Sequence, residues 1–189
     1  MQKILWLIFT AAGLTTVAQA PVANFKATNV ATGSAVSLAD YANQNGVVLL
    51  FTSNDCPFDA YYHTRIKTLI ETYQGKINFV LINSYLEPEE SEEAMKAAYA
   101  NWKITVPYLA DKEQAALRAL GARKSPEAFV LKSSKAGMMI FYSGAIDDSP
   151  QTAAGVDESY LKNAIDALLS GAAPVNASRA VGCTIRRQD

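Results

Sequence analysis

Histidine and cysteine are scarce in this sequence of 189 residues, which contains one histidine and two cysteines. A single histidine excludes a metal site built from several imidazoles. Two cysteines exclude a disulfide-dense scaffold and a four-cysteine zinc site, but they leave room for one pair, Cys56 with Cys183. We therefore expect neither a metal ion nor a cofactor.

An excess of charge of either sign is also missing. Lysine and arginine number 17 and aspartate and glutamate 18, which gives a formal net charge of -1. Proteins that bind nucleic acids carry a basic excess or patch, so we expect no nucleic-acid partner. A hydrophobic content of 50%, with 10 glycines and 7 prolines, is ordinary for a globular protein and excludes a disordered or collagen-like chain.

The first twenty residues have the pattern of a secretory signal peptide. Lys3 is their only charge, an apolar run begins at Ile4, and Ala18 and Ala20 form an A-x-A cleavage site. Pro21 would hinder cleavage after Ala20, so Ala18 is an alternative site. We expect an exported protein, periplasmic or extracellular, in an oxidising compartment. An uncleaved membrane anchor is the alternative, although the apolar stretch is short for a span of about 20 residues.

The remaining chain divides into a predicted domain, residues 21–170, and a C-terminal tail, residues 171–189. The domain alternates strand and helix patterns. The tail contains glycine, alanine, proline and asparagine without an apolar period, and it carries Cys183. The patterns predict strands at 47–52, 77–82, 106–109, 127–131 and 138–142, and helices at 57–73, 88–102, 112–120 and 158–169.

Two continuous apolar runs, VVLLFT at 47–52 and INFVLI at 77–82, are typical of strands that are buried on both faces. A helix between them predicts a parallel pair with a right-handed crossover. The strands at 127–131 and 138–142 flank a short turn and predict a hairpin. The sequence therefore predicts an α/β fold in which a mixed central sheet has helices on both faces.

Cys56 lies where the first buried strand turns into a helix, and this is the sharpest feature of the sequence. Pro57 suits the first helical position, which makes Cys56 roughly the N-cap. Free backbone N–H groups and the helix dipole lower the pKa of a thiol there. Asp55 and Asp59 act in the opposite direction because negative charge disfavours a thiolate. The alternative is an inert cysteine packed under the helix.

Two further side chains on the predicted helix, those of Asp59 and His63, are candidates for a role in the chemistry of Cys56. Asp59 either accepts a backbone N–H as a helix-capping acid, which we favour, or accepts a proton from the thiol of Cys56. His63 is seven residues beyond Cys56, about 10.5 Å along a helix, which is too far for a direct hydrogen bond. We therefore expect His63 to be a surface or packing residue.

The dipeptide Ser125-Pro126 directly precedes a predicted strand, a place compatible with a cis peptide bond, although a trans turn is the ordinary alternative. Arg123 and Lys124 are close by in sequence. They either supply positive charge near a thiolate or are solvated.

Cys183 is 127 positions from Cys56, but the tail is long enough to bring the two together. Twelve residue steps separate Gly171 from Cys183, and an extended chain of that length spans about 40 Å. The pair is either a static disulfide or a redox couple in which Cys183 resolves an oxidised Cys56. The sequence leaves both possibilities open.

Several of these segments together resemble the thioredoxin-like superfamily, specifically its exported redoxin and AhpC/TSA-type branch. The segments are VVLLFTSNDCPFDAYY, VPYLADKEQAALRALGARKSPEAFVLK and MMIFYSGAIDD, and the ending VGCTIRR is similar to that of some exported members. The resemblance implies that Cys56 is the nucleophile and that a cis Pro126 faces it. It also implies that the Ser125 backbone pairs with an extended substrate.

The chain departs from two patterns of this superfamily. The second cysteine of a thioredoxin motif is replaced by Asp59, so dithiol exchange within the motif is impossible. The threonine of peroxiredoxins lies three residues before their cysteine, whereas Thr52 lies four before Cys56, which weakens the case for peroxide reduction.

We predict an exported thiol–disulfide oxidoreductase that acts through Cys56 with Cys183 as its resolving cysteine. Ser125 and Pro126 are the predicted substrate-binding residues, and Asp59 and Arg123 are auxiliary candidates. The expected partners are thiols, disulfides or peroxide, together with an external thiol reductant. The alternatives are a peroxiredoxin-like peroxidase and a non-catalytic binding module with a structural disulfide.

Overall fold

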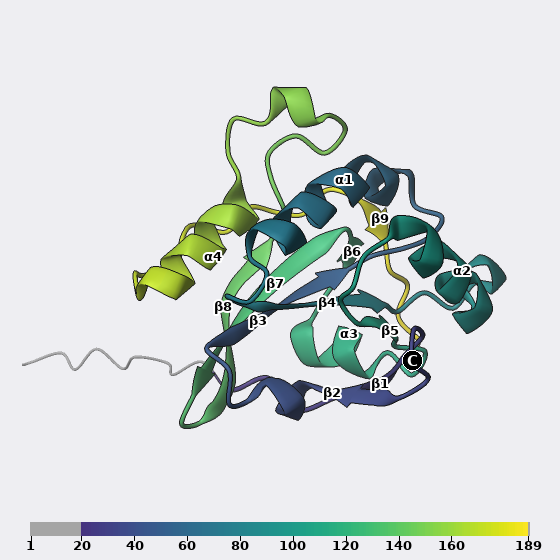
Figure 1. Cartoon of the computed structure of the whole chain (residues 1–189), viewed down its shortest axis with the longest axis horizontal. Coiled ribbons are helices and arrows are strands. Elements are labelled where there is room, and N and C mark those ends of the chain that lie inside the picture. Colours follow the sequence, from purple (N-terminus) through teal and green to yellow (C-terminus); the bar gives the residue numbers. More distant parts are fainter. Residues whose placement is uncertain (1–19, 189) are drawn as a thin grey trace, which may run out of the picture.

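The computed structural model describes residues 20–188, so the predicted signal peptide lies almost entirely outside the described residues. The described part contains one large sheet, one two-stranded sheet, four α-helices and three short 3-10 helices (Figure 1). In chain order the elements are β1 (Lys26–Asn29), β2 (Ala35–Ser37), η1 (Leu38–Tyr41), β3 (Gly46–Phe51), α1 (Pro57–Thr72), β4 (Asn78–Asn83), η2 (Pro88–Glu90), α2 (Glu92–Trp102), β5 (Tyr108–Ala110), α3 (Ala115–Leu120), β6 (Lys124–Ser125), β7 (Glu127–Ser134), β8 (Gly137–Gly144), η3 (Ala153–Gly155), α4 (Tyr160–Ser170) and β9 (Cys183–Thr184).

The large sheet has the strand order β2-β1-β5-β4-β3-β7-β8. The strands β3, β4 and β5 are parallel, whereas the hairpins β1–β2 and β7–β8 add antiparallel strands at the two ends. The predicted mixed sheet, the parallel pairing of the two apolar runs and the β7–β8 hairpin are thus confirmed.

Both faces of the central strand β3 are covered, which explains its unbroken apolar sequence. Val48 and Leu50 point into a core formed with α1, α2 and α4. Val47, Leu49 and Phe51 point into a second core, on the side of α3 and η1. Figure 1 shows α1 and α4 on one side of the sheet and α3 on the other, as the predicted fold class requires.

The prediction of one helix across 88–102 is wrong. The short helix η2 ends at Glu90, and α2 starts after Ser91, whose backbone leaves the helical region (φ -56°, ψ 160°). The Ser91 hydroxyl accepts the Ala94 N–H at 3.3 Å and caps α2. Because serine is a preferred N-cap residue, Ser91 was the available signal for this break.

The other differences concern short elements and helix ends. The helix predicted from Lys112 begins at Ala115, because Gln114 has a left-handed backbone (φ 53°). The hairpin β1–β2 and the two-stranded sheet β6–β9 are absent from the prediction, since these strands have two to four residues and no clear alternation. None of the helices in the described part has the length and apolarity needed to cross a bilayer.

Candidate active site around the Cys56–Cys183 disulfide

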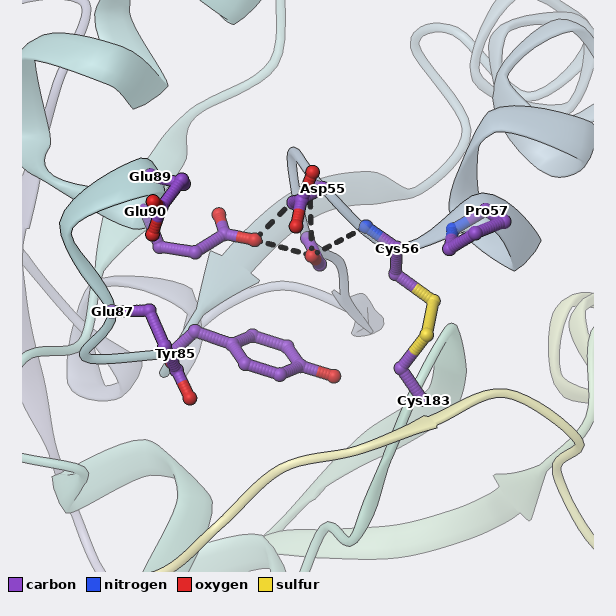
Figure 2. Close-up of a pocket in the computed structure, with 9 residues that line it drawn as sticks. Asp55, Cys56, Pro57, Tyr85, Glu87, Glu89, Glu90 and Cys183 are labelled. Atoms are coloured by element: carbon purple, nitrogen blue, oxygen red, sulfur yellow. Dashed lines mark hydrogen bonds between the residues drawn. A yellow bond between two sulfur atoms is a disulfide. The ribbon is translucent and has the colours of Figure 1, made fainter.

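The two cysteines form a disulfide across the 127 positions that separate them (Figure 2). Their Cα atoms are 6.1 Å apart, within the usual range for a disulfide. The prediction that the tail reaches Cys56 is therefore confirmed. Figure 1 shows the tail, in yellow, running from α4 across the molecule to β9, which contains Cys183.

Cys56 is held at the junction of β3 and α1, as predicted. It is the N-cap of α1, its backbone is extended (φ -75°, ψ 121°), and Pro57 is the first helical residue. The Cys56 side chain makes no capping hydrogen bond, and the positive end of the α1 dipole lies beside this residue. This arrangement stabilises a thiolate at Cys56 once the disulfide is reduced.

A buried carboxylate, Glu90, fixes the loop that leads to Cys56. It accepts the Ser53 hydroxyl and the backbone N–H groups of Asn54 (2.9 Å) and Asp55 (3.2 Å). The Ser53 oxygen in turn accepts the Cys56 N–H at 3.0 Å. The position of the sulfur therefore depends on an acid that lies 34 residues further along the chain.

Glu90 was missed in the sequence because it lies in an acidic stretch that looks like an ordinary helix start. The structure places it in η2, where the residue is only 2% exposed. The Asn83 amide donates to its carboxylate at 2.6 Å, and the Lys112 ammonium donates to its carbonyl oxygen at 2.6 Å. Four donors to one carboxylate offset the cost of burying its charge.

The peptide bond between Ser125 and Pro126 is cis, as the resemblance implied. The Ser125 carbonyl oxygen lies 3.5 Å from the Cys56 sulfur, so this loop faces the disulfide directly. Ser125 also pairs with Cys183 across the β6–β9 ladder. The chain's own tail therefore occupies the backbone position at which the resemblance places an extended substrate.

Asp59 does not cap the helix, so the interpretation we favoured is wrong. The Cys56 N–H, which a capping box would give to Asp59, goes to Ser53, while the Asp59 carboxylate accepts the Ser125 hydroxyl at 2.6 Å. Asp59 is fully buried, and burial raises the pKa of Asp59 to about 7, against a lowering by the Ser125 hydrogen bond. Its carboxyl group therefore changes protonation near neutral pH beside the cis-proline loop.

Beyond Cys183 the tail is anchored by contacts other than the disulfide. The Ile185 N–H donates to the Arg123 carbonyl at 3.0 Å, and the Ile185 side chain is 4% exposed in the core on the α3 side of the sheet. Gln114 donates to the Arg186 carbonyl at 2.7 Å and accepts the Gln188 N–H at 2.8 Å. None of these contacts involves the sulfur atoms of the disulfide.

Gly182 is required for this close packing of the tail. A Cβ atom at this position would lie 2.0 Å from the Ser125 carbonyl oxygen and 3.0 Å from the Pro126 nitrogen. Only glycine allows the tail backbone to lie this close to the cis-proline loop. The pair Gly182-Cys183 was visible in the sequence, but its fit against Ser125 was not.

Two other candidates do not reach the sulfurs through their side chains. Arg123 contacts the tail through its backbone carbonyl, and its side chain is exposed. His63 packs against Trp102, with ring centroids 4.1 Å apart, as expected for a packing residue, and burial lowers the pKa of His63. Within residues 20–188, no three His, Cys, Asp or Glu side chains gather in a way that would hold a metal ion.

The fold and this site define a thioredoxin-like protein with a cysteine at the start of α1 opposite a cis proline. The AhpC/TSA family model matches residues 18–140, which is more than half of the chain. The chain therefore belongs to the AhpC/TSA family. The match includes Cys56 and Pro126 but ends before the tail, so Cys183 lies outside it.

Solved structures agree with this fold. An uncharacterized conserved protein from Geobacillus kaustophilus is 30% identical, with a TM-score of 0.79 and coverage of 90% of this chain and 92% of that one. The hypothetical protein SMc02350 from Sinorhizobium meliloti 1021 is 26% identical, with a TM-score of 0.79 and coverage of 90% and 94%. A thioredoxin-like protein in the oxidized form is similar in fold, at 17% identity, TM-score 0.58 and coverage of 72% and 86%. No curated protein sequence matches this chain.

Proposed function

We propose that the protein is an exported thiol–disulfide oxidoreductase in which Cys56 is the attacking cysteine and Cys183 the resolving one. The observation that carries the proposal is the disulfide itself, which joins the N-cap of α1 to the tail directly opposite the cis-proline loop. Export is supported by the signal-peptide pattern of residues 1–20 and by the oxidising compartment that a disulfide requires.

The reaction begins from the reduced protein. The Cys56 thiolate attacks one sulfur of a substrate disulfide, which forms a mixed disulfide with Cys56 and releases the other substrate sulfur as a thiolate. The Cys183 thiolate then attacks the Cys56 sulfur and releases the second substrate thiolate. The Cys56–Cys183 disulfide is formed, and two electrons have passed to the substrate. An external thiol reductant returns two electrons to the protein.

The anchored tail supports a resolving role for Cys183. Because backbone pairing and the Gln114 contacts hold Cys183 near Cys56 without the disulfide, a mixed disulfide at Cys56 meets its resolving thiol at high effective concentration. Asp59 is the candidate proton acceptor and donor for this exchange, since its carboxyl group is coupled through Ser125 to the cis-proline loop.

The test uses the full exported chain with Cys183→Ser and Cys56→Ser as paired variants. Turnover of bis(2-hydroxyethyl) disulfide with dithiothreitol should be lost in Cys56→Ser. In Cys183→Ser turnover should slow, and a mixed disulfide at Cys56 should accumulate, visible by mass spectrometry. Unchanged turnover in Cys183→Ser would remove Cys183 from the mechanism.

The reduction potential of the pair separates a working couple from a structural disulfide. A working couple should have a potential near about -200 mV, whereas structural disulfides lie below about -300 mV. A potential below that limit, together with no turnover, would contradict the proposal and support a binding module.

A thiol peroxidase is the second candidate, and membership of the AhpC/TSA family favours it. In that reaction the Cys56 thiolate takes one oxygen from hydrogen peroxide and becomes a sulfenic acid, and the remaining oxygen leaves as water after protonation. Cys183 then forms the disulfide and releases a second water. Rapid peroxide consumption by the reduced protein and a trapped sulfenic acid in Cys183→Ser would support this candidate.

A further inference from the structure

A cavity of about 300 Å³ opens directly onto the disulfide, and both Cys56 and Cys183 line it (Figure 2). This volume is at the small end of ligand sites in proteins. The disulfide is part of the cavity wall, so a molecule that enters the cavity comes into contact with the sulfur atoms. The cavity is therefore a route by which a small thiol reaches the disulfide.

The tail closes the other approach to the disulfide. An extended polypeptide would need the backbone edge of Ser125, but Cys183 already pairs with that residue in the β6–β9 ladder. The packing of Gly182 against the Ser125 carbonyl leaves no room for a second chain there. A small molecule in the cavity meets neither obstacle.

The cavity wall is strongly acidic. Four carboxylates line it, those of Asp55, Glu87, Glu89 and Glu90, and none of its lining residues in the described chain is basic. Glu90 is engaged by the loop that leads to Cys56. The other three side chains are exposed at the rim, and none of them forms an ion pair within residues 20–188.

Two lysines lie near the site, but neither lines the cavity. The Lys112 ammonium donates to the carbonyl oxygens of Tyr85 and Glu90, and it attracts the Glu87 carboxylate only through space, without an ion pair. The Lys124 ammonium donates to the Thr184 hydroxyl, on the tail. The three rim carboxylates therefore face an entering molecule without a basic side chain beside them in the lining.

A second, independent feature of the cavity is the hydroxyl group of Tyr85. Tyr85 lines the cavity and is 9% exposed, and its hydroxyl has no hydrogen-bond partner. In Figure 2 its ring extends from the wall toward the Cys56–Cys183 disulfide. Buried polar groups are rarely left without a partner. The hydroxyl oxygen is itself covered in this structure, so it bonds a polar atom of a ligand only after a small movement of the cavity wall.

We propose that this cavity admits the small thiol that resets the protein, and that it selects a thiol with a cationic group over an anionic one. The proposal rests on the proposed redox function. The entering thiolate attacks one sulfur of the Cys56–Cys183 disulfide, forming a mixed disulfide and releasing the other cysteine as a thiolate. A second thiolate attacks the ligand sulfur, so the ligand leaves as its own disulfide and two electrons remain on the protein.

The test compares three small thiols as reductants of the oxidised full chain: cysteamine (cationic), 2-mercaptoethanol (neutral) and 2-mercaptoethanesulfonate (anionic). Each rate is corrected for thiolate fraction and divided by the rate of the same thiol with bis(2-hydroxyethyl) disulfide. At low salt we expect cysteamine to exceed the sulfonate by about tenfold or more, because one-signed clefts change association rates by that factor. The ratio should fall at high salt, where the rim charges are screened.

Variants then assign the selectivity to the rim. Glu87→Gln with Glu89→Gln should reduce the ratio severalfold, whereas Glu92→Gln with Glu93→Gln removes the same charge from the exposed start of α2, outside this cavity, and should leave the ratio unchanged. Tyr85→Phe should slow all three thiols alike, by about fivefold for one lost hydrogen bond.

The outcomes separate this proposal from the one on which it rests. Equal corrected rates for the three thiols, or an ordering that survives the rim variant, would overturn the selectivity and leave the redox couple intact. If dithiothreitol reduces the disulfide but none of the three small thiols does, the cavity proposal alone falls. If dithiothreitol fails as well, the redox function falls with it.

Discussion

The two ends of the disulfide are held by different kinds of structure. Cys56 follows the most buried strand of the sheet and is positioned by side chains, above all the Glu90 carboxylate and the Ser53 hydroxyl. Cys183 belongs to a two-residue strand and is positioned by backbone contacts of the tail with Ser125 and Arg123. The Cys56 sulfur thus belongs to the core of the domain, whereas the C-terminal tail brings the Cys183 sulfur to it.

The difference separates the part of the chain that the AhpC/TSA family model covers from the part that lies outside it. Cys56 and Pro126 lie inside the AhpC/TSA match, and their arrangement follows from the sheet and the helix above it. The tail lies outside that match. It supplies the second cysteine of the disulfide, and its strand β9 pairs with the backbone edge of Ser125. The fold thus places Cys56 at the start of α1, and the tail limits what can reach it.

Loss of the disulfide should have the largest effect on stability. Cys183→Ala should lower the free energy of unfolding by about 4–5 kcal/mol in the chain-entropy model, because the link closes a loop of 127 positions. Urea unfolding without reductant measures the change. Cys56→Ala should cost the same, and the double variant no more than either. A loss below about 1 kcal/mol in Cys183→Ala would show that the other tail contacts suffice.

Ionisation of Asp59 should have the second-largest effect on the free energy of unfolding. Asp59 lies near Cys56, so this prediction tests the end of the disulfide that is built into the core. Burial raises the pKa of Asp59 from 3.8 to about 7, so the folded state binds more protons than the unfolded state between these values. The contribution of the protonated Asp59 to the free energy of unfolding is therefore fully present below pH 4. It is lost as the pH rises through 7, and the total loss is about 4 kcal/mol. Asp59→Asn should remove this decline in unfolding experiments from pH 4 to 8. Asp55→Asn, at an exposed position in the same region, should keep it.

Gly182→Ala should disturb the tail end alone. The new Cβ would overlap the Ser125 carbonyl, and the forced shift should cost about 2–3 kcal/mol. The disulfide should also become easier to reduce in a dithiothreitol titration, because its tail half no longer fits. Val181→Ala, at the neighbouring exposed position, is the control and should change neither value. Unaltered reduction in Gly182→Ala would mean that the close approach to Ser125 does not position Cys183.

Gln114→Asn should give the smallest effect. The shorter amide loses its bonds to the Arg186 carbonyl, the Gln188 N–H and the Ser84 carbonyl, at a cost of about 2 kcal/mol, and asparagine tolerates the left-handed backbone at this position. Hydrogen exchange should become faster at residues 185–188 and stay unchanged in β3. Equal protection of the tail in variant and parent would show that β6–β9 pairing alone retains it.

The site shows where sequence reasoning succeeded and where it failed. The apolar run before Cys56 and the proline after it predicted the strand–helix junction, because strand burial and proline geometry are local properties. Asp59 was misjudged because its spacing from Cys56 suits a cap, while its actual partner, Ser125, is 66 residues away. Glu90 was missed for a similar reason, since its carboxylate binds a distant loop.

The sequence by itself determined the α/β fold and the location of Cys56, since continuous apolar runs and helix-start residues act over a few neighbouring positions. It also established that the tail was long enough to reach that cysteine. Only the tertiary structure decided that the tail pairs with Ser125, that Gly182 fits beneath it, and that four carboxylates surround the entrance to the disulfide. These contacts join residues far apart in the chain, and no periodic pattern encodes a single close approach between two backbones.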